Sequence, residues 1–435
     1  MALEELLAES RRCNRCGYCQ PPCPVFQATG VESSSGRGRI QLLRAAAEGR
    51  VEFSRDLGPA LFECLLCRAC VEACAPKAET DRVVAAGRAE WFERWGRTPV
   101  TDLLFRALLP NRARMETAVR AAFYGIHTGL AHAADVLGLL RLQPRAAAAT
   151  AWVGDPPREF LTARLARLRL SPTGSRARVG YFVSCGMNVL APEAGEATVR
   201  LLASLGCEVV PLDNACCGLP AYVYGDREAA ARLLRQAASA FRDSGPLDAV
   251  VTDCGSCSSH LRHGAELLGL DDAALGVLVD LTRDLGEFVQ STGAIPEHAV
   301  ACRATYHDPC HLSRHQSLTL PPRELLSEVE GLDYREMCEA SWCCGGAGAY
   351  GIEHSGIARN ILARKMGNAR DTGADVVVSA CPACVTQLAF GARESGLPVR
   401  VAHLSEVLAR AYGVDLAPLV ASDTAAIAAI GGNAA

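Results

Sequence analysis

A cysteine-rich segment occurs twice in the second half of this 435-residue chain. Each copy has a lone cysteine, a Cys-Cys-Gly triplet and a C-x-x-C pair. The cysteines are Cys185, Cys216, Cys217, Cys254 and Cys257 in the first copy and Cys310, Cys343, Cys344, Cys381 and Cys384 in the second. The lone cysteine and the triplet are separated by 30 residues in the first copy and 32 in the second, and 36 residues separate the triplet cysteines from the C-x-x-C pair in both. A fixed internal period indicates a duplicated structural unit. Five thiols drawn from three distant points predict a metal or cluster site in each unit.

Two further cysteine runs lie near the N-terminus, both with the spacing C-x2-C-x2-C-x3-C. This spacing is typical of bacterial ferredoxins, where three close thiolates hold three corners of a [4Fe–4S] cubane and the fourth cysteine ligates the other cluster. The spacing therefore predicts two cubanes. The ligands would be Cys13, Cys16, Cys19 and Cys74 for one cluster, and Cys64, Cys67, Cys70 and Cys23 for the other. Zinc is the alternative, but zinc sites usually pair two C-x2-C turns across a longer loop and rarely need four cysteines in a run.

The spacer between Cys23 and Cys64 is 40 residues long and rich in helix formers. A helix is predicted at Arg39–Glu48, ended by Gly49, and a second from Pro59 to Leu66. Residues 1–86 are therefore expected to form a helical ferredoxin module.

Residues 87–175 carry no cysteine and are predicted to form a helical connector. The apolar stretch Ala121–Leu142 contains His127, His132 and Asp135, which argues against a membrane-spanning helix. A helix lying on a membrane surface is the alternative to a core or partner-binding helix, which we favour because no Trp or Phe stripe is present. Two breaks are expected in the connector. They are a linker at Ala146–Pro157 and a turn at Ser171–Ser175.

Strand and helix patterns alternate in both copies, which predicts parallel α/β units. Strands are expected at Arg178–Ser184, Glu208–Leu212, Asp248–Asp253, Ala304–His307 and Asp375–Ala380, with helices at about 192–205, 226–242 and 354–370. Each copy also closes similarly, and Val279–Leu285 is predicted to match Ala402–Leu408. The fold class is thus α + α/β. A helical ferredoxin module and connector are followed by two Rossmann-like domains, at 176–295 and 296–420. The thiols of these domains are expected at the carboxyl ends of strands, where open α/β sheets bind ligands. They also precede helix N-termini, which favour an anionic cluster.

Histidines at positions 307, 311 and 315 flank Cys310. One of them could hydrogen-bond a cluster or relay a proton, but ordinary surface or core histidines are the favoured interpretation. Three cysteines have no counterpart in the other copy and are predicted to be ordinary buried thiols. They are Cys207, Cys302 and Cys338.

The net charge and the N-terminal residues limit which classes of function the chain can have. The net charge is −4 and no Lys/Arg block is present, which argues against a nucleic-acid partner. The first residues, Met1–Arg12, include three glutamates and no apolar core, so they do not resemble a signal peptide. With 21 cysteines, an odd number, reduced thiols on metal in the cytoplasm are expected, and peripheral contact with the inner face of the cell membrane is left open.

With these motifs in view, the chain resembles the iron–sulfur subunit of glycolate oxidase and its relatives. These include lactate-utilisation iron–sulfur proteins, the iron–sulfur subunit of anaerobic glycerol-3-phosphate dehydrogenase and the catalytic subunit of heterodisulfide reductase. The resemblance covers roughly residues 10–411. It rests on Cys13–Cys19, on Gly36–Ile40 and on both Cys-Cys-Gly units. In heterodisulfide reductases each five-cysteine unit holds a noncubane [4Fe–4S] cluster, so the resemblance implies one or two such clusters here in addition to the two cubanes. Many glycolate-oxidase-type relatives lack part of a C-x-x-C pair, whereas this chain keeps both sets complete.

Two functions follow from this resemblance. The favoured function is that of an electron-transfer subunit. A separate FAD-dependent subunit would oxidise a 2-hydroxy acid such as glycolate or lactate. The electrons would then pass through this flavin-free chain to an acceptor such as a quinone. The alternative is a disulfide reductase with catalysis at the Cys-Cys-Gly clusters, which would make Cys216, Cys217, Cys343 and Cys344 the catalytic residues. A third interpretation is a scaffold with zinc in the duplicated half.

Overall fold

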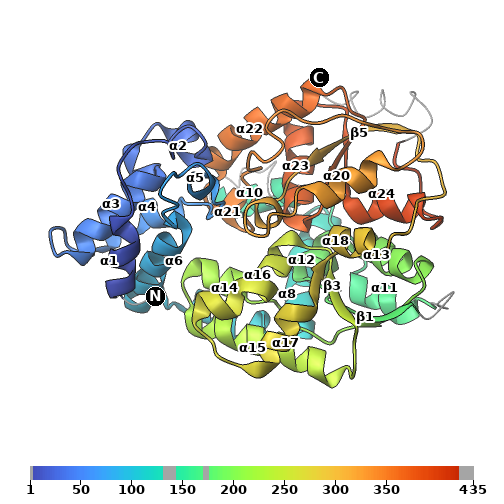
Figure 1. Ribbon diagram of the computed structural model, residues 1–435, viewed down its shortest axis with the longest axis horizontal. Helices are drawn as coiled ribbons and strands as arrows, with labels where there is room; N and C mark the ends of the chain where they lie inside the picture. Colours follow the sequence, from blue (N-terminus) through green and yellow to red (C-terminus); the bar gives the residue numbers. More distant parts are fainter. Residues whose placement is uncertain (1–2, 131–143, 170–175, 421–435) are drawn as a thin grey trace.

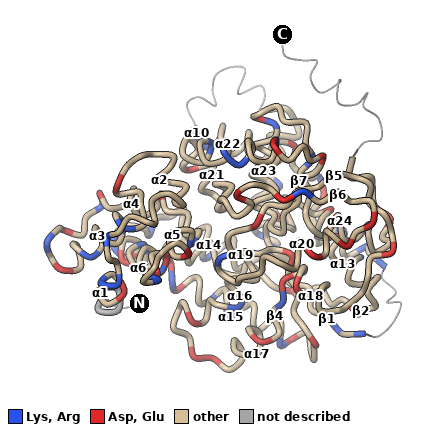
Figure 2. Tube along the Cα trace, turned by 45° about the horizontal axis from the view of Figure 1, so that its top comes forward, with Lys and Arg blue, Asp and Glu red and all other residues tan. Residues whose placement is uncertain are grey.

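The computed structural model describes residues 3–130, 144–169 and 176–420. Figure 1 shows a helical N-terminal part (blue) beside two α/β parts, one coloured green to yellow and the other orange to red. The helices that connect these parts in the sequence contact both α/β parts. Lys, Arg, Asp and Glu are interspersed over the described trace without a block of one sign (Figure 2).

The N-terminal part is a bundle of short helices around a small apolar core. Its helices are α1 (Leu3–Arg11), α2 (Pro24–Thr29), α3 (Gly36–Ala47), α4 (Gly58–Phe62), α5 (Ala69–Glu72) and α6 (Thr80–Trp91), with 3-10 turns at Glu32–Ser34 and Arg55–Leu57. The two long helices, α3 and α6, pack together, and their buried residues Ile40, Leu43 and Val83 share one core. Because these helices are short, packing of their apolar faces, rather than helix propensity, stabilises them.

The predicted helix at Arg39–Glu48 is confirmed, although α3 begins earlier, at Gly36. Ser35 caps it, because its hydroxyl accepts a hydrogen bond from the backbone N–H of Gly38 at 3.0 Å. The helix predicted from Pro59 is also present, but α4 ends at Phe62, before the predicted Leu66.

The connector is helical in its described residues, as predicted. It contains two π-helical turns, Phe92–Gly96 and Leu103–Leu108, and the helices α7 (Pro99–Asp102), α8 (Arg112–His127), α10 (Pro144–Val153) and α11 (Leu161–Arg167). The predicted linker at Ala146–Pro157 is wrong, because α10 occupies most of it and packs on the second copy. Trp152 anchors this helix: its indole is buried, and its Nε1 donates a hydrogen bond to Oε1 of Gln387 at 2.6 Å.

The apolar stretch Ala121–Leu142 is described only in part. Its first residues belong to α8, whereas residues 131–143 lie outside the described residues, as does the turn predicted at Ser171–Ser175. None of the described helices is both long and apolar enough to cross a bilayer.

Each copy contains one four-stranded parallel sheet, and both sheets have the same strand order, β2-β1-β3-β4 and β6-β5-β7-β8. The first copy comprises β1 (Ala177–Tyr181), α12 (Cys185–Leu190), α13 (Pro192–Ser204), β2 (Cys207–Pro211), α14 (Leu219–Tyr224), α15 (Arg227–Asp243), β3 (Ala249–Thr252), α16 (Gly255–Leu268), α17 (Ala273–Leu281), β4 (Thr282–Asp284) and α18 (Leu285–Ser291). The second comprises β5 (Cys302–His307), α19 (Cys310–Ser313), α20 (Leu320–Ser327), β6 (Leu332–Tyr334), α21 (Tyr350–Glu353), α22 (Ser355–Asp371), β7 (Val376–Ser379), α23 (Pro382–Ser395), β8 (Arg400–His403) and α24 (Leu404–Ala411). The predicted α/β duplication is therefore confirmed.

The predicted match between the closing segments is out of register. It sets Asp284 opposite Val407, whereas the strand registers pair Thr252 with Asp284 and Ser379 with His403. Asp284 therefore corresponds to His403, four residues earlier than predicted. A shift of four residues keeps the apolar face of a helix in place, so periodicity alone could not detect the error.

The two copies pack against each other about an approximate two-fold axis. The contacts come in equivalent pairs: α13 packs on α24 and α20 on α18, while α12 packs on α23 and α19 on α16. Buried side chains from both sheets, including Val251 and Val378, join in one apolar core. The helices that begin at the cysteines are thereby brought to the interface between the copies.

Candidate iron–sulfur centres

The two N-terminal cysteine runs gather around two small cavities. One cavity is lined by Cys23, Cys64, Cys67 and Cys70, and the other by Cys13, Cys16, Cys19 and Cys74, with Cys70 also on its wall. This grouping matches the predicted exchange of the fourth cysteine between the runs. Every one of the 21 cysteines is a free thiol.

The backbone around these cavities is shaped to present N–H groups to sulfur. Sγ of Cys19 accepts from the backbone N–H of Arg37 at 3.3 Å, and Sγ of Cys64 accepts from that of Leu66 at 3.4 Å. Leu66 is left-handed, with φ 51°. Two further contacts of this kind join Phe26 N to Cys23 Sγ at 3.5 Å and Ala78 N to Cys74 Sγ at 3.4 Å. Backbone N–H groups aimed at sulfur stabilise the thiolate form that an iron–sulfur cluster requires, so the donor set fits such a cluster.

Burial opposes ionisation of the inner thiols when no metal is bound. Desolvation raises the pKa of Cys23 to about 11 and raises that of Cys70 well above its usual value. The pKa of Cys67 is raised by a hydrogen bond with Cys343 and by burial. Cluster binding at these positions must therefore displace protons.

The five cysteines of the first copy form a continuous string in which neighbouring thiols shift each other's pKa. Cys185 begins α12, and Cys254 is the N-cap of α16. The string runs Cys185, Cys216, Cys217, Cys257, Cys254. Hydrogen bonds from Cys216 and Cys257 lower the pKa of Cys217 to about 5, which favours its thiolate.

The second copy repeats this arrangement. Cys310 begins α19, and Cys381 is the N-cap of α23. The string runs Cys310, Cys343, Cys344, Cys384, Cys381. The pKa values of Cys344 and Cys381 are both lowered by hydrogen bonds from neighbouring thiols.

The two strings are joined to each other and to the N-terminal part. Cys254 and Cys381, the equivalent N-cap residues, lie close enough across the interface between the copies for each thiol to shift the pKa of the other. At the other end of the second string, Cys343 raises the pKa of Cys67 of the N-terminal part, and both residues belong to one buried cluster. Sulfur atoms therefore follow one another from the ferredoxin-like part through the second copy to the first.

A family model described as "4Fe-4S dicluster domain" matches residues 9–77, and one described as "Cysteine-rich domain" matches residues 179–262 and 304–389. The "Probable glycolate oxidase iron-sulfur subunit" of Bacillus subtilis (strain 168) is 32% identical over 423 residues, which cover 93% of this chain and 94% of that protein. The chain belongs to the family of glycolate oxidase iron–sulfur subunits.

Shorter relatives of the family match about half of the chain. "Lactate utilization protein A" of Geobacillus kaustophilus (strain HTA426) is 32% identical over 237 residues, which cover 53% of this chain and 98% of that protein. The protein of the same name from Halalkalibacterium halodurans is 31% identical over 237 residues, which cover 53% of this chain and 96% of that protein. The predicted resemblance is thus confirmed.

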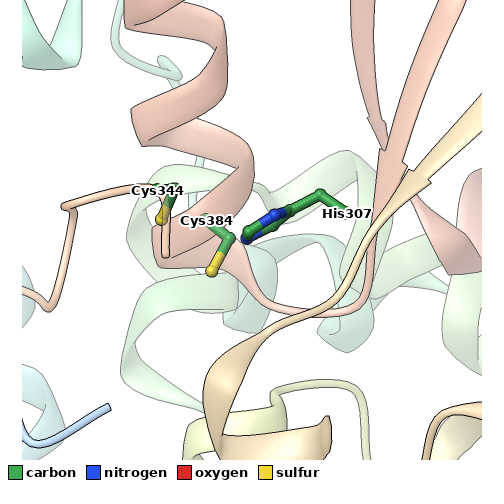
Figure 3. A group of neighbouring side chains, drawn as sticks. All are labelled: His307, Cys344 and Cys384. Carbon is green, nitrogen blue, oxygen red and sulfur yellow. The ribbon is translucent and has the colours of Figure 1, made fainter. Parts of the chain in front are cut away.

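Within this family fold, the second copy carries a histidine at its cysteine site where the first has none. His307 lies at the end of β5, and a ring nitrogen of His307 and the Sγ atoms of Cys344 and Cys384 all lie within 4.8 Å of one another (Figure 3). Both ring nitrogens lack a hydrogen-bond partner among the described residues, and desolvation lowers the pKa of His307 to about 3. Counting back from the lone cysteines, Phe182 holds the equivalent place in the first copy.

Other histidine and cysteine predictions fared differently. The interpretation of His307, His311 and His315 as ordinary surface or core histidines stays a prediction. His307 is buried among the cysteines, and His311 and His315 line a cavity. Cys207 is buried as predicted, but Cys302 is only half-buried and Cys338 is exposed, so the prediction of buried thiols is wrong for these two.

Proposed function

We propose that this chain is the electron-transfer subunit of a 2-hydroxy-acid dehydrogenase of the glycolate or lactate type. A separate FAD-dependent subunit oxidises the hydroxy acid, and this chain carries the electrons onward to an acceptor such as a quinone. The names of the relatives support the hydroxy-acid substrate class.

The observation that carries this proposal is the unbroken sequence of thiols from Cys67 through Cys343 and Cys381 to Cys254 and Cys185. Electron transfer needs closely spaced redox centres, and cysteine sets that touch one another provide for that spacing. When bound, iron–sulfur clusters supply one-electron redox chemistry. The predicted ligand sets would hold two cubanes in the N-terminal part, and the five-cysteine sets would hold one or two noncubane clusters.

Exposure of the outer N-terminal site suits it to receive electrons from a partner. Cys16 is exposed, and the nearby Tyr18 is 66% exposed. The inner site, around Cys67, instead faces the second copy. We assign electron entry to the outer site and onward transfer to the inner one.

Burial of the duplicated cysteines weighs against the alternative, a disulfide reductase that uses Cys216, Cys217, Cys343 and Cys344. All four are at most 5% exposed. A disulfide substrate must bring its sulfur into contact with the centre that cleaves it, whereas electrons reach a buried centre through neighbouring centres.

The experiment uses the chain purified anaerobically with its clusters, with and without an added FAD-dependent hydroxy-acid dehydrogenase subunit. With the partner present, we expect glycolate or lactate to bleach the visible absorption of the clusters. The isolated chain should neither bleach nor oxidise the acid. Oxidation of the acid by the isolated chain, or clusters that stay oxidised with an active partner, would refute the proposal.

A further inference from the structure

A cavity of about 240 Å³ lies where the N-terminal part meets both copies. It is bordered by α6, α14 and α16, which lie together in Figure 1, and by the residues following Cys310. Four histidines line it: His260, His263, His311 and His315. None of the described lining residues is a cysteine. No single sequence motif predicts this cavity, because its histidines come from two separate segments.

His260 is the polar group whose hydrogen-bonding capacity this cavity leaves unused. It is 1% exposed, and neither ring nitrogen has a partner among the described residues. Burial lowers its pKa to about 4, so the ring is neutral and carries one N–H donor and one acceptor nitrogen. A buried polar group without a partner costs free energy, which a bound ligand with a hydrogen-bonding atom would recover.

The charges around the cavity do not favour an anion. Arg68 pairs with Asp81 at 2.9 Å and Arg82 pairs with Glu266 at 2.6 Å, and Glu79 contacts both arginines. Two cations thus face three carboxylates. The remaining walls include apolar side chains such as Leu219 and Leu267. Ten of the fifteen lining residues are polar or charged. This mixed lining suits a neutral molecule that combines an apolar ring with hydrogen-bonding oxygens.

The second copy shows what fits in the equivalent place. Counting from the C-x-x-C pairs, His260 corresponds to Gln387, and α14 and α16 correspond to α21 and α23. There α10 covers the groove, and the Trp152 indole donates its N–H to Gln387. In the first copy α6 covers the groove instead and leaves the cavity. A flat bicyclic ring with one hydrogen bond to this position is therefore accommodated by the repeated fold.

The cavity also touches all three cysteine regions. Leu66 and Arg68 flank Cys67, Leu219 follows the first Cys-Cys-Gly triplet, and His311 follows Cys310, with its Nδ1 3.8 Å from that residue's Sγ. A redox-active ligand held here would lie beside several candidate centres at once.

We propose that this cavity binds the head group of a quinone, with the N–H of His260 donating a hydrogen bond to a quinone carbonyl. The site rests on the proposed function, for which it supplies the electron acceptor. The hydroxy acid loses two electrons and two protons as it becomes a 2-oxo acid. The quinone gains two electrons through the iron–sulfur centres and two protons from water, and leaves as a quinol.

The test measures binding by titration calorimetry on the oxidised, cluster-loaded chain. The probe is 2,3-dimethyl-1,4-naphthoquinone, a bicyclic quinone whose substituted ring resists addition of thiols. Loss of one hydrogen bond predicts a Kd about tenfold weaker in His260→Phe, whereas His260→Gln, which keeps an N–H donor, should stay close to the native value. Leu267→Trp, which fills the cavity, should abolish binding.

His298 provides the matched control, because it is exposed and remote from the cavity lining, and His298→Phe should bind as the native chain does. An unchanged visible spectrum shows that a variant has kept its clusters. If Leu267→Trp loses its clusters, the quinone affinities of the two His260 variants alone test the site. Native chain that binds no quinone, or His260→Phe that binds undiminished, overturns the site. Bleaching of the clusters by hydroxy acid and flavin subunit, without quinone, tests the proposed function separately.

Discussion

The two copies have the same strand order and the same five cysteine positions, but they differ in what surrounds the cysteines. The second copy places His307 beside its thiols and packs Trp152 of the connector against Gln387. The first has Phe182 and an open cavity at those places. The shared features are the ones that gather the thiols, and the differing ones set what else can reach them. Duplication here preserves a scaffold and lets the two sites specialise.

The strongest test of this comparison removes one cysteine from each copy. Four [4Fe–4S] clusters would give about 16 iron atoms per chain, and Cys257→Ser or Cys384→Ser should each remove about 4. Iron, acid-labile sulfide and zinc are measured on anaerobically purified protein. Cys338→Ser is the control, because that thiol is exposed and belongs to neither set.

Two other outcomes would change the comparison. Loss of both centres from one substitution would mean that the touching residues Cys254 and Cys381 hold a shared centre. Zinc in place of iron would confine electron transfer to the N-terminal part.

The next test opens the groove of the second copy by removing the Trp152 side chain that fills it. Trp152→Ala should lower the free energy of unfolding by about 3–5 kcal/mol, because a buried indole is replaced by a cavity. Urea denaturation measures this loss. Trp95→Ala, at a half-buried ring stacked on Phe53, is the control and should cost clearly less.

Added indole sharpens this result. It should recover part of the stability of Trp152→Ala by binding the new cavity, and leave Trp95→Ala unchanged. A loss as small as that of Trp95→Ala would show that α10 is a loose cover and that the two grooves are alike.

The glycine of each Cys-Cys-Gly triplet should be required in both copies. Gly218 has φ +98° and a Cβ there would lie 2.8 Å from the carbonyl oxygen of Ala230, while Gly345 has φ +79° and the corresponding contact, to Ala358, is 3.0 Å. Gly218→Ala and Gly345→Ala should each cost about 1–2 kcal/mol of stability, with Gly218 the worse.

Gly276 is the matched control, because it lies in α17 with open space around it. Gly276→Ala should raise stability by about 0.5–1 kcal/mol in the same urea titrations. Triplet variants as stable as the native chain would mean that neither turn constrains its cysteines.

The smallest expected change in stability concerns Tyr181 and Tyr306, which hold equivalent positions in the two copies. The hydroxyl of Tyr181 donates to Asp253 at 2.6 Å, whereas that of Tyr306 has no partner among the described residues, and Ala380 stands where the first copy has Asp253. Tyr181→Phe should lower the free energy of unfolding by about 1 kcal/mol, and Tyr306→Phe should leave it unchanged or raise it. Equal losses in the two variants would contradict this difference.

Sequence reasoning succeeded where the information is local. Cysteine spacing predicted which thiols gather around each N-terminal cavity, and strand and helix patterns predicted both sheets. It failed where distant segments decide the outcome. The linker expected at Ala146–Pro157 became α10 because Trp152 finds a partner more than 200 residues away. The cavity at His260 depends on how α6 packs on the first copy, which no spacing records.

The approximate two-fold axis between the copies has an evolutionary consequence. Two equal halves that bury equivalent surfaces against each other have the architecture of a homodimer whose subunits were fused into one chain. In such an ancestor every change appeared on both sides of the axis at once. Fusion removed that constraint, and from then on a histidine could enter the second copy, and a tryptophan of the connector could close its groove, without a matching change in the first copy.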